Sequence, residues 1–153
     1  MDAPTAVIAE DEPALRAALR AHLARLWPEL AIAGEAADGV EALGMIERTR
    51  PQVAFLDIEM PGMTGLDLAR RIADRCHVVF VTAYEAHAIA AFEAGAVDYV
   101  LKPYEMARLA ATVARVRERL HEAPRALDGI LAELARALPA REHLRWFNAP
   151  ERD

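Results

Sequence analysis

Short, continuous apolar runs alternate with helix-like stretches along most of this 153-residue chain. Strands buried on both faces of a parallel sheet read as unbroken apolar runs rather than as an apolar–polar alternation. The runs cover residues 6–9, 30–34, 53–56, 78–81 and 97–101, and helical periodicity follows each of them, over 13–26, around 40–46, and over 66–73, 85–94 and about 105–120. The pattern predicts an α/β fold, a doubly wound five-stranded parallel sheet with helices on both faces.

Turn and cap residues punctuate these elements. Pro13 opens the first helix, where proline is tolerated, Asp38 is a plausible N-cap for the second, and Gly95 is a C-cap for the fourth. The pattern breaks after Pro124. We therefore expect one domain over residues 1–122, followed at 123–153 by a linker or dimerisation helix and a tail. That helix has apolar residues at helical spacing, namely Leu127, Ile130, Leu131, Leu134 and Leu138.

Composition excludes several classes of function. The net charge of −6 argues against direct nucleic-acid binding by this piece, because phosphate neutralisation needs a basic face. No apolar run approaches the roughly 18 residues of a membrane span, and the acidic N-terminus does not resemble a signal peptide. A single cysteine, Cys76, cannot form an internal disulfide, which fits a reducing cytoplasm.

Polar residues follow four of the expected strands at their carboxyl ends. Glu10 and Asp11 follow the first, Asp57 the third, Thr82 the fourth and Lys102 the fifth. Ligands of open parallel sheets bind beyond these ends. Lys102 is also the one lysine among 18 basic residues. Carboxylates, a hydroxyl and an ammonium on one edge predict a site for a divalent cation and a phosphoryl group.

Asp57 is the predicted reactive group, since a carboxylate can attack phosphorus to give an acyl phosphate. The alternative is that Asp57 merely caps a turn. Glu10 and Asp11 suit Mg²⁺, which takes oxygen ligands, although acids here could equally decorate a helix start. Gly-rich nucleotide-binding loops are missing, and the five histidines lack metal-ligand spacing, so we interpret them as surface or packing residues.

Four segments together closely resemble the receiver domain of bacterial two-component response regulators. They read Val7-Ile8-Ala9-Glu10-Asp11-Glu12, Leu56-Asp57-Ile58-Glu59-Met60-Pro61-Gly62, Val81-Thr82-Ala83 and Tyr99-Val100-Leu101-Lys102-Pro103. The resemblance covers residues 5 to about 121. It implies a flavodoxin-like sheet with strand order 2-1-3-4-5, a cis Lys102–Pro103 bond, and a cytoplasmic signalling protein rather than an enzyme with an external substrate.

The resemblance also implies a role for each matching residue. Asp57 would accept a phosphoryl group from a sensor histidine kinase. Mg²⁺ would be held directly by Asp11, Asp57 and the backbone carbonyl of Glu59, and through water by Glu10. Lys102 would contact the phosphoryl oxygens, Thr82 would move to bond one of them, and Tyr99 would turn inward behind Thr82 as the switch aromatic. Tyr99 could instead be an ordinary half-buried strand residue.

Two flanking positions predict the lifetime of the acyl phosphate. Glu59 and Tyr84 lie two residues beyond Asp57 and Thr82, beside the path of attacking water. A bulky Tyr84 next to an acid predicts slow self-dephosphorylation. Glu10 also departs from the more usual Asp of the family, so that its water-mediated role depends on a longer side chain.

The implied output is transcriptional regulation through a further domain. The segments 9–13 and 82–85 look most like regulators with a LytTR-type DNA-binding domain, which we expect to be absent from these 153 residues. Phosphorylation is expected to shift the region from Thr82 to Tyr99 and to promote a homodimer through the fourth and fifth helices. Four residues of the fourth helix would supply the patch, unless they face the core: Ala88, Ile89, Ala91 and Phe92.

Two alternatives remain open at this level. A phosphohydrolase of the haloacid-dehalogenase type also uses a strand-end Asp with Mg²⁺, Thr and Lys. It normally has D-x-D after its first strand, whereas Asp57 follows the third and the second acid is Glu59. The other alternative is a receiver-like docking module that is never phosphorylated, against which the complete set of site residues argues.

Overall fold

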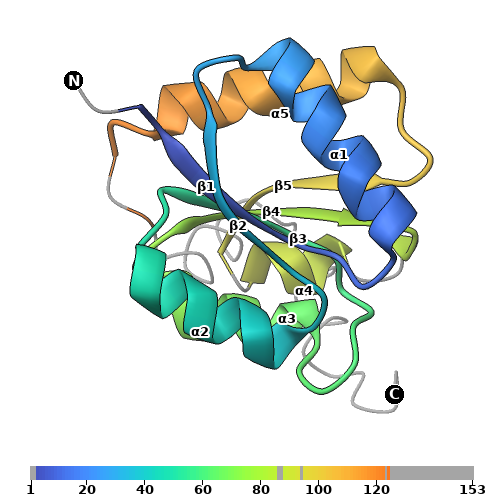
Figure 1. Cartoon of the computed structure of the whole chain (residues 1–153), viewed down its shortest axis with the longest axis vertical. Helices are drawn as coiled ribbons and strands as arrows, with labels where there is room; N and C mark the ends of the chain where they lie inside the picture. The colour runs from blue at the N-terminus through green and yellow to red at the C-terminus, as the bar shows by residue number, and fades with distance from the viewer. Residues whose placement is uncertain (1–2, 86–87, 94, 123, 125–153) are drawn as a thin grey trace, which may run out of the picture.

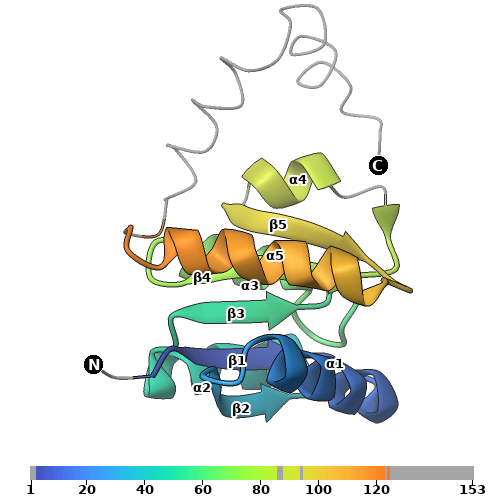
Figure 2. The same cartoon turned by 90° about the horizontal axis from the view of Figure 1, so that it is seen from above.

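The computed structural model describes residues 3–85, 88–93, 95–122 and 124, and within them it contains a five-stranded parallel sheet. The strand order is β2-β1-β3-β4-β5, as the family resemblance implied, with β2 and β5 at opposite edges (Figure 2). The fold class is thereby confirmed. The strands are β1 (Thr5–Ala9), β2 (Ala31–Ala36), β3 (Val53–Leu56), β4 (His77–Thr82) and β5 (Ala96–Leu101).

Helices cover both faces of this sheet (Figure 1). They are α1 (Pro13–Leu26), α2 (Gly39–Thr49), α3 (Gly65–Ile72), α4 (Ala88–Glu93) and α5 (Met106–Arg119). Helices α1 and α5 lie on one face, and α2, α3 and α4 lie on the other. Since every strand of the sheet interior is buried from both sides, its residues are continuously apolar, which is the pattern that predicted it.

Alternate strand residues enter two separate apolar layers. Ile8 and Phe55 pack toward α1 and α5, where Leu23 is fully buried. Their neighbours Val7 and Leu56 pack into the other layer, which the helices α2 and α3 complete. The sheet is thus held on both faces, and the residues that follow its strands are fixed at its edge.

Local signals set several element boundaries. The Asp38 carboxylate accepts a hydrogen bond from the backbone N–H of Glu41 at 2.8 Å, so the predicted N-cap of α2 is confirmed. Thr64 caps α3 in the same way, through a hydrogen bond from the backbone N–H of Asp67 to its hydroxyl oxygen. Gly95 adopts a φ of 98°, as its predicted role requires.

The end of one strand differs from the prediction. Strand β2 extends to Ala36 rather than ending at Gly34, because pairing with β1 continues and the backbone N–H of Glu10 donates to the Ala36 carbonyl at 3.0 Å. Helix α4 covers Ala88–Glu93, inside the predicted range 85–94, and residues 86–87 and 94 lie outside the described part. Ala91 is fully buried in the core, so it cannot contribute to a surface patch, whereas Ala88 and Ile89 are half-buried.

The expected linker helix and tail at 123–153 lie outside the described residues, apart from Pro124. The division at residue 122 stays a prediction. Within the described ranges, no helix combines the length and the apolar character that crossing a membrane would demand.

Candidate functional site

The strand pairing brings the predicted site residues to one edge of the sheet. The last residues of β1 and β3, Ala9 and Leu56, are partners in the ladder, and the backbone N–H of Asp57 donates to the Ala9 carbonyl at 3.0 Å. On the other side, the backbone N–H of Lys102 donates to the Thr82 carbonyl at 2.8 Å. Parallel register therefore places the acids, Asp57 and Lys102 together, although they are up to 92 residues apart in sequence.

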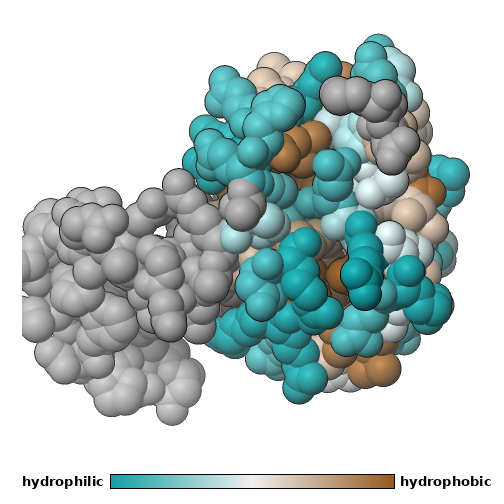
Figure 3. All heavy atoms as spheres, turned by 90° about the vertical axis from the view of Figure 1, so that its left-hand side faces the viewer, coloured by the Kyte–Doolittle hydropathy of each residue, from teal (hydrophilic) through white to brown (hydrophobic). Residues whose placement is uncertain are grey.

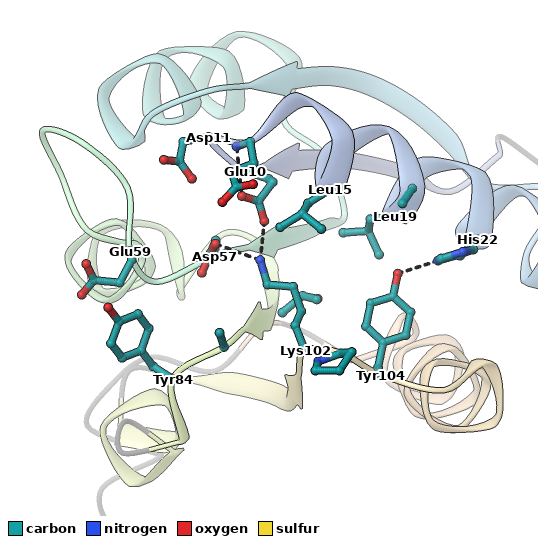
Figure 4. A pocket seen from close by; sticks show the side chains of 15 residues that line it. Glu10, Asp11, Leu15, Leu19, His22, Asp57, Glu59, Tyr84, Lys102 and Tyr104 are labelled. Atoms are coloured by element: carbon teal, nitrogen blue, oxygen red, sulfur yellow. Dashed lines mark hydrogen bonds and ion pairs between the residues drawn. The ribbon is translucent and has the colours of Figure 1, made fainter.

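Lys102 bridges two of the carboxylates. Its Nζ lies 2.6 Å from Oε1 of Glu10 and 3.1 Å from Oδ2 of Asp57 (Figure 4). All three side chains are largely buried. Asp11 is exposed, yet one of its carboxylate oxygens lies within 4.8 Å of those of Glu10 and Asp57. The predicted convergence of Glu10, Asp11, Asp57 and Lys102 is therefore present in the structure.

Backbone contacts hold the acidic residues in place. The Glu10 carbonyl accepts a bond from Nη1 of Arg16 at 2.6 Å, and Oε2 of Glu10 accepts one from the backbone N–H of Glu12 at 3.1 Å. Oδ1 of Asp57 accepts from the backbone N–H of Ile58 at 2.7 Å. Arg16 is a residue that sequence reasoning missed, because its contact depends on how α1 packs beside β1.

Gly65 lets the loop after β3 fold tightly against the site. A Cβ at this position would lie 2.0 Å from the Asp57 carbonyl oxygen, which is far inside van der Waals contact. The backbone N–H of Gly65 donates to the Ile58 carbonyl at 2.9 Å. The loop that carries Glu59 is thus closed beside Asp57, and only glycine fits the closure.

The electrostatics of the cluster favour a charged lysine. Burial raises the pKa of Glu10, and the negative charge of Asp57 adds to this, although the hydrogen bonds from Lys102 and Glu12 oppose it. Burial alone would lower the pKa of Lys102, but its hydrogen bonds and charge interactions with Glu10 and Asp57 raise it above the usual value. Lys102 therefore remains an ammonium at neutral pH.

The donor set fits a hard divalent cation. The cluster offers three carboxylates, and Mg²⁺ is bound by oxygen atoms, often one or two carboxylates together with phosphate oxygens. Lys102 offsets part of the negative charge of the cluster, and the exposed Asp11 leaves the remaining side open to solvent. The residues that are present suit Mg²⁺ better than a soft metal, for which thiolate or imidazole ligands would be expected.

Thr82 and Tyr99 lie on the neighbouring strands β4 and β5. Thr82 is fully buried, and its Oγ1 is 3.4 Å from the backbone N–H of Tyr84. The Tyr99 hydroxyl donates a hydrogen bond to the Tyr84 carbonyl, and the Tyr99 ring packs 6.1 Å from the ring of Phe80. Tyr84 itself projects beside Glu59 at one side of the site (Figure 4).

A cavity of about 650 Å³ opens over the acidic cluster. Glu59 and Tyr84 line one side of it, and His22 and Tyr104 line the other (Figure 4). Nδ1 of His22 and the Tyr104 hydroxyl are 2.6 Å apart, although 82 residues separate them in sequence. Sequence reasoning treated His22 as a surface or packing residue and passed over Tyr104, whose position directly after Lys102-Pro103 was the available signal.

The Lys102–Pro103 bond is cis, as the resemblance implied. Residues 6–114 match the response regulator receiver domain. The chain belongs to this family. Its members are signalling proteins of two-component systems rather than classical enzymes.

Named relatives agree with this assignment. The chain is 47% identical over 119 residues to an uncharacterised response regulatory protein of Vibrio cholerae, covering 76% of this chain and 46% of the relative. It is 42% identical over 114 residues to the transcriptional regulatory protein BtsR of Escherichia coli, covering 73% of this chain and 47% of BtsR. The chain therefore spans about half the length of these relatives.

A solved DNA-binding response regulator of Staphylococcus aureus, named as LuxR family, has a similar structure. Its TM-score is 0.68 at 31% identity, with 74% of this chain and 98% of that chain covered. These names support a receiver domain, and none of them specifies the LytTR-type output domain that the resemblance suggested.

Proposed function

We propose that this chain is a phosphorylation-controlled switch in which Asp57 accepts a phosphoryl group from a sensor histidine kinase. The observation that carries the proposal is the position of Lys102, whose Nζ bonds both Asp57 and Glu10 within a cluster of three carboxylates. An ammonium so placed offsets part of the charge of the acids before phosphorylation and part of the charge of the phosphoryl oxygens after it. A turn-capping aspartate would need neither this lysine nor the neighbouring acids.

The transfer itself is a displacement at phosphorus. An Asp57 carboxylate oxygen forms the new bond to phosphorus, while the bond to the kinase histidine nitrogen breaks and its electron pair stays on the imidazole. Ile58 orients the carboxylate through its bond to Oδ1. Lys102 then stabilises the charge on the transferred group, and the Thr82 hydroxyl moves to donate a hydrogen bond to it.

Mg²⁺ is the proposed cofactor of this step. Asp11, Asp57 and the backbone carbonyl of Glu59 would hold it directly, and Glu10 would act through water. When bound, the cation offsets the charge that the acids and the phosphoryl oxygens bring together. Glu10 fits the indirect role because its carboxylate is already engaged by Lys102 and by the backbone of Glu12.

The readout would be a shift of the region from Thr82 to Tyr99 and dimerisation through α4 and α5. A phosphoryl group adds close to two negative charges and strong acceptor oxygens, which can bias a two-state element. In a longer cytoplasmic protein, this switch would control transcription. The motif pattern at 9–13 and 82–85 favours a LytTR-type output, with residues 1–122 as the receiver and 123–153 as linker. Neither nucleic acid nor a membrane would be a direct partner of this piece.

The decisive experiment is intact-mass measurement after incubation with phosphoramidate and Mg²⁺. We expect the wild-type chain to gain one phosphoryl group and Asp57→Asn to gain none. Equal labelling of both chains, or no adduct on the wild type, would contradict the assignment and favour the docking module. Sustained turnover of an added phosphate ester would instead favour the phosphohydrolase, which the position of Asp57 after β3 disfavours.

A further inference from the structure

The cavity over Asp57 has two chemically different ends. At one end lie the acids and Lys102, which account for phosphoryl binding. The cavity then continues between α1 and the loop after β5, where its wall is apolar (Figure 4). The apolar residues that line the cavity include Leu15, Ala18, Leu19, Val81 and Pro103. A phosphoryl group bound at Lys102 therefore has an apolar chamber directly beside it.

His22 and Tyr104 make the far wall less polar than their types suggest. Their polar atoms, Nδ1 and the hydroxyl oxygen, are 2.6 Å apart and bond each other. The two rings meet edge to face, with centroids 5.5 Å apart and planes at 88°. This bond occupies the tyrosine hydroxyl and one of the two imidazole nitrogens, and both residues line the cavity. A flat, apolar body suits such a wall better than a charged one.

Resting on the phosphoacceptor role proposed above, we propose that this chamber is a leaving-group subsite for small aryl phosphodonors. The chain would accept phosphoryl from an aromatic acyl phosphate, with benzoyl phosphate as the probe, in preference to acetyl phosphate. An Asp57 oxygen bonds to phosphorus, the bond between phosphorus and the acyl oxygen breaks, and benzoate leaves with the electron pair. No proton or further reactant is required.

The size of the whole cavity, its acidic end and the chamber together, is compatible with this substrate class. A volume of about 650 Å³ falls within the range of roughly 300–1,000 Å³ that is typical of small-molecule sites. Moving a phenyl ring from water onto an apolar wall lowers its free energy in proportion to the buried area, so we expect benzoyl phosphate to show about tenfold higher kcat/KM than acetyl phosphate. Acetate has only a methyl group to place against the same wall.

The test compares three donors on the full 153-residue chain in the presence of Mg²⁺, with the phosphorylation rate followed by intact mass. Benzoyl and acetyl phosphate report the subsite, and phosphoramidate has no apolar body. Leu15→Asn places a polar group in the chamber at a side chain that is already 39% exposed. We expect this variant to lose most of the benzoyl preference. Val40→Asn is the matched control, because Val40 is 61% exposed on α2 and outside this cavity.

Each outcome has a definite meaning. A benzoyl preference in the wild type and in Val40→Asn, but not in Leu15→Asn, supports the subsite. Equal efficiencies of benzoyl and acetyl phosphate in the wild type overturn it, because the chamber then contributes nothing. A benzoyl preference that Leu15→Asn retains also overturns it, because the intrinsic reactivity of the donor would then explain the rates. Failure of all three donors, phosphoramidate included, would overturn the phosphoacceptor role itself and the subsite with it.

Discussion

Asp98 shows how a single buried carboxylate can stabilise the fold away from the acidic cluster. It receives hydrogen bonds from both Nη atoms of Arg108 at 3.0 and 3.1 Å, from the Thr112 hydroxyl at 2.7 Å and from the backbone N–H of Tyr99 at 2.8 Å. Burial alone would raise the pKa of Asp98, but the bonds from Arg108, Thr112 and Tyr99 hold it below the usual value.

Asp98→Asn should therefore destabilise the chain in a pH-dependent way. With a depressed pKa in the folded state, the stabilisation is fully present above the unfolded pKa of about 3.9 and is lost as the pH falls through the folded pKa. We expect a loss of about 2 kcal/mol in the free energy of unfolding at pH 7 and a smaller difference near pH 3. Urea denaturation at both pH values measures this. Asp74→Asn, at an exposed carboxylate, is the control, and a loss independent of pH would contradict the charge-based account.

Tyr84 is the residue expected to determine how long the acyl phosphate survives. Its side chain is 44% exposed and stands beside Glu59 at the edge of the cavity (Figure 4). We expect Tyr84→Ser to speed phosphate loss several-fold, because water then reaches the phosphorus more easily. After the donor is removed, the decay of the adduct mass reports the rate. Unchanged kinetics would refute shielding by this side chain.

Among the strands, β5 is connected to the loop after β4 by a hydrogen bond. The Tyr99 hydroxyl donates to the Tyr84 carbonyl, so the predicted switch residue holds the backbone of the predicted shield. Tyr99→Phe removes this bond, and we expect faster dephosphorylation as a result. In a Tyr84→Ser background the same change should add little, since coupled residues act non-additively. Additive effects on the decay rate would show that Tyr99 acts by another route.

The elements also show what sequence can and cannot anticipate. Strands β1, β3, β4 and β5 were recognisable because burial on both faces leaves an unbroken apolar run. Each run ends where its polar site residue begins, so the runs themselves predict where Glu10, Asp57 and Lys102 lie. The end of β2 at Ala36 could not be predicted from an apolar run, because it depends on pairing with β1.

Contacts between distant side chains were the part that sequence could not provide. The bond between His22 and Tyr104 joins α1 to the loop after β5 across 82 residues, and no local pattern encodes it. The contact of Arg16 with the Glu10 carbonyl likewise depends on how α1 packs against the sheet. Such contacts follow from the angle at which a helix crosses the sheet, which helical periodicity alone does not specify.

At the scale of the whole molecule, the two ends of the sheet differ in character. The carboxyl ends carry the acidic cluster and its cavity. At the amino ends, hydrophilic residues separate small hydrophobic areas (Figure 3).

The edge strand β5 ends at Leu101, which is 40% exposed, and Ile89 of neighbouring α4 is half-buried. This edge is the part of the described surface to which the proposed dimerisation would belong.

Phosphorylation should therefore convert the chain from monomer to dimer through the α4 and α5 side of the molecule. We expect analytical ultracentrifugation to show a dimer for the wild type after treatment with phosphoramidate and Mg²⁺, but not for Asp57→Asn. Ile89→Asp should still be labelled yet remain monomeric, because a charge at a packed apolar contact is costly to desolvate. Val40→Asp, at an exposed position on α2, should dimerise like the wild type. If Ile89→Asp dimerises equally well, the interface lies elsewhere, and a dimer of treated Asp57→Asn would separate assembly from phosphorylation.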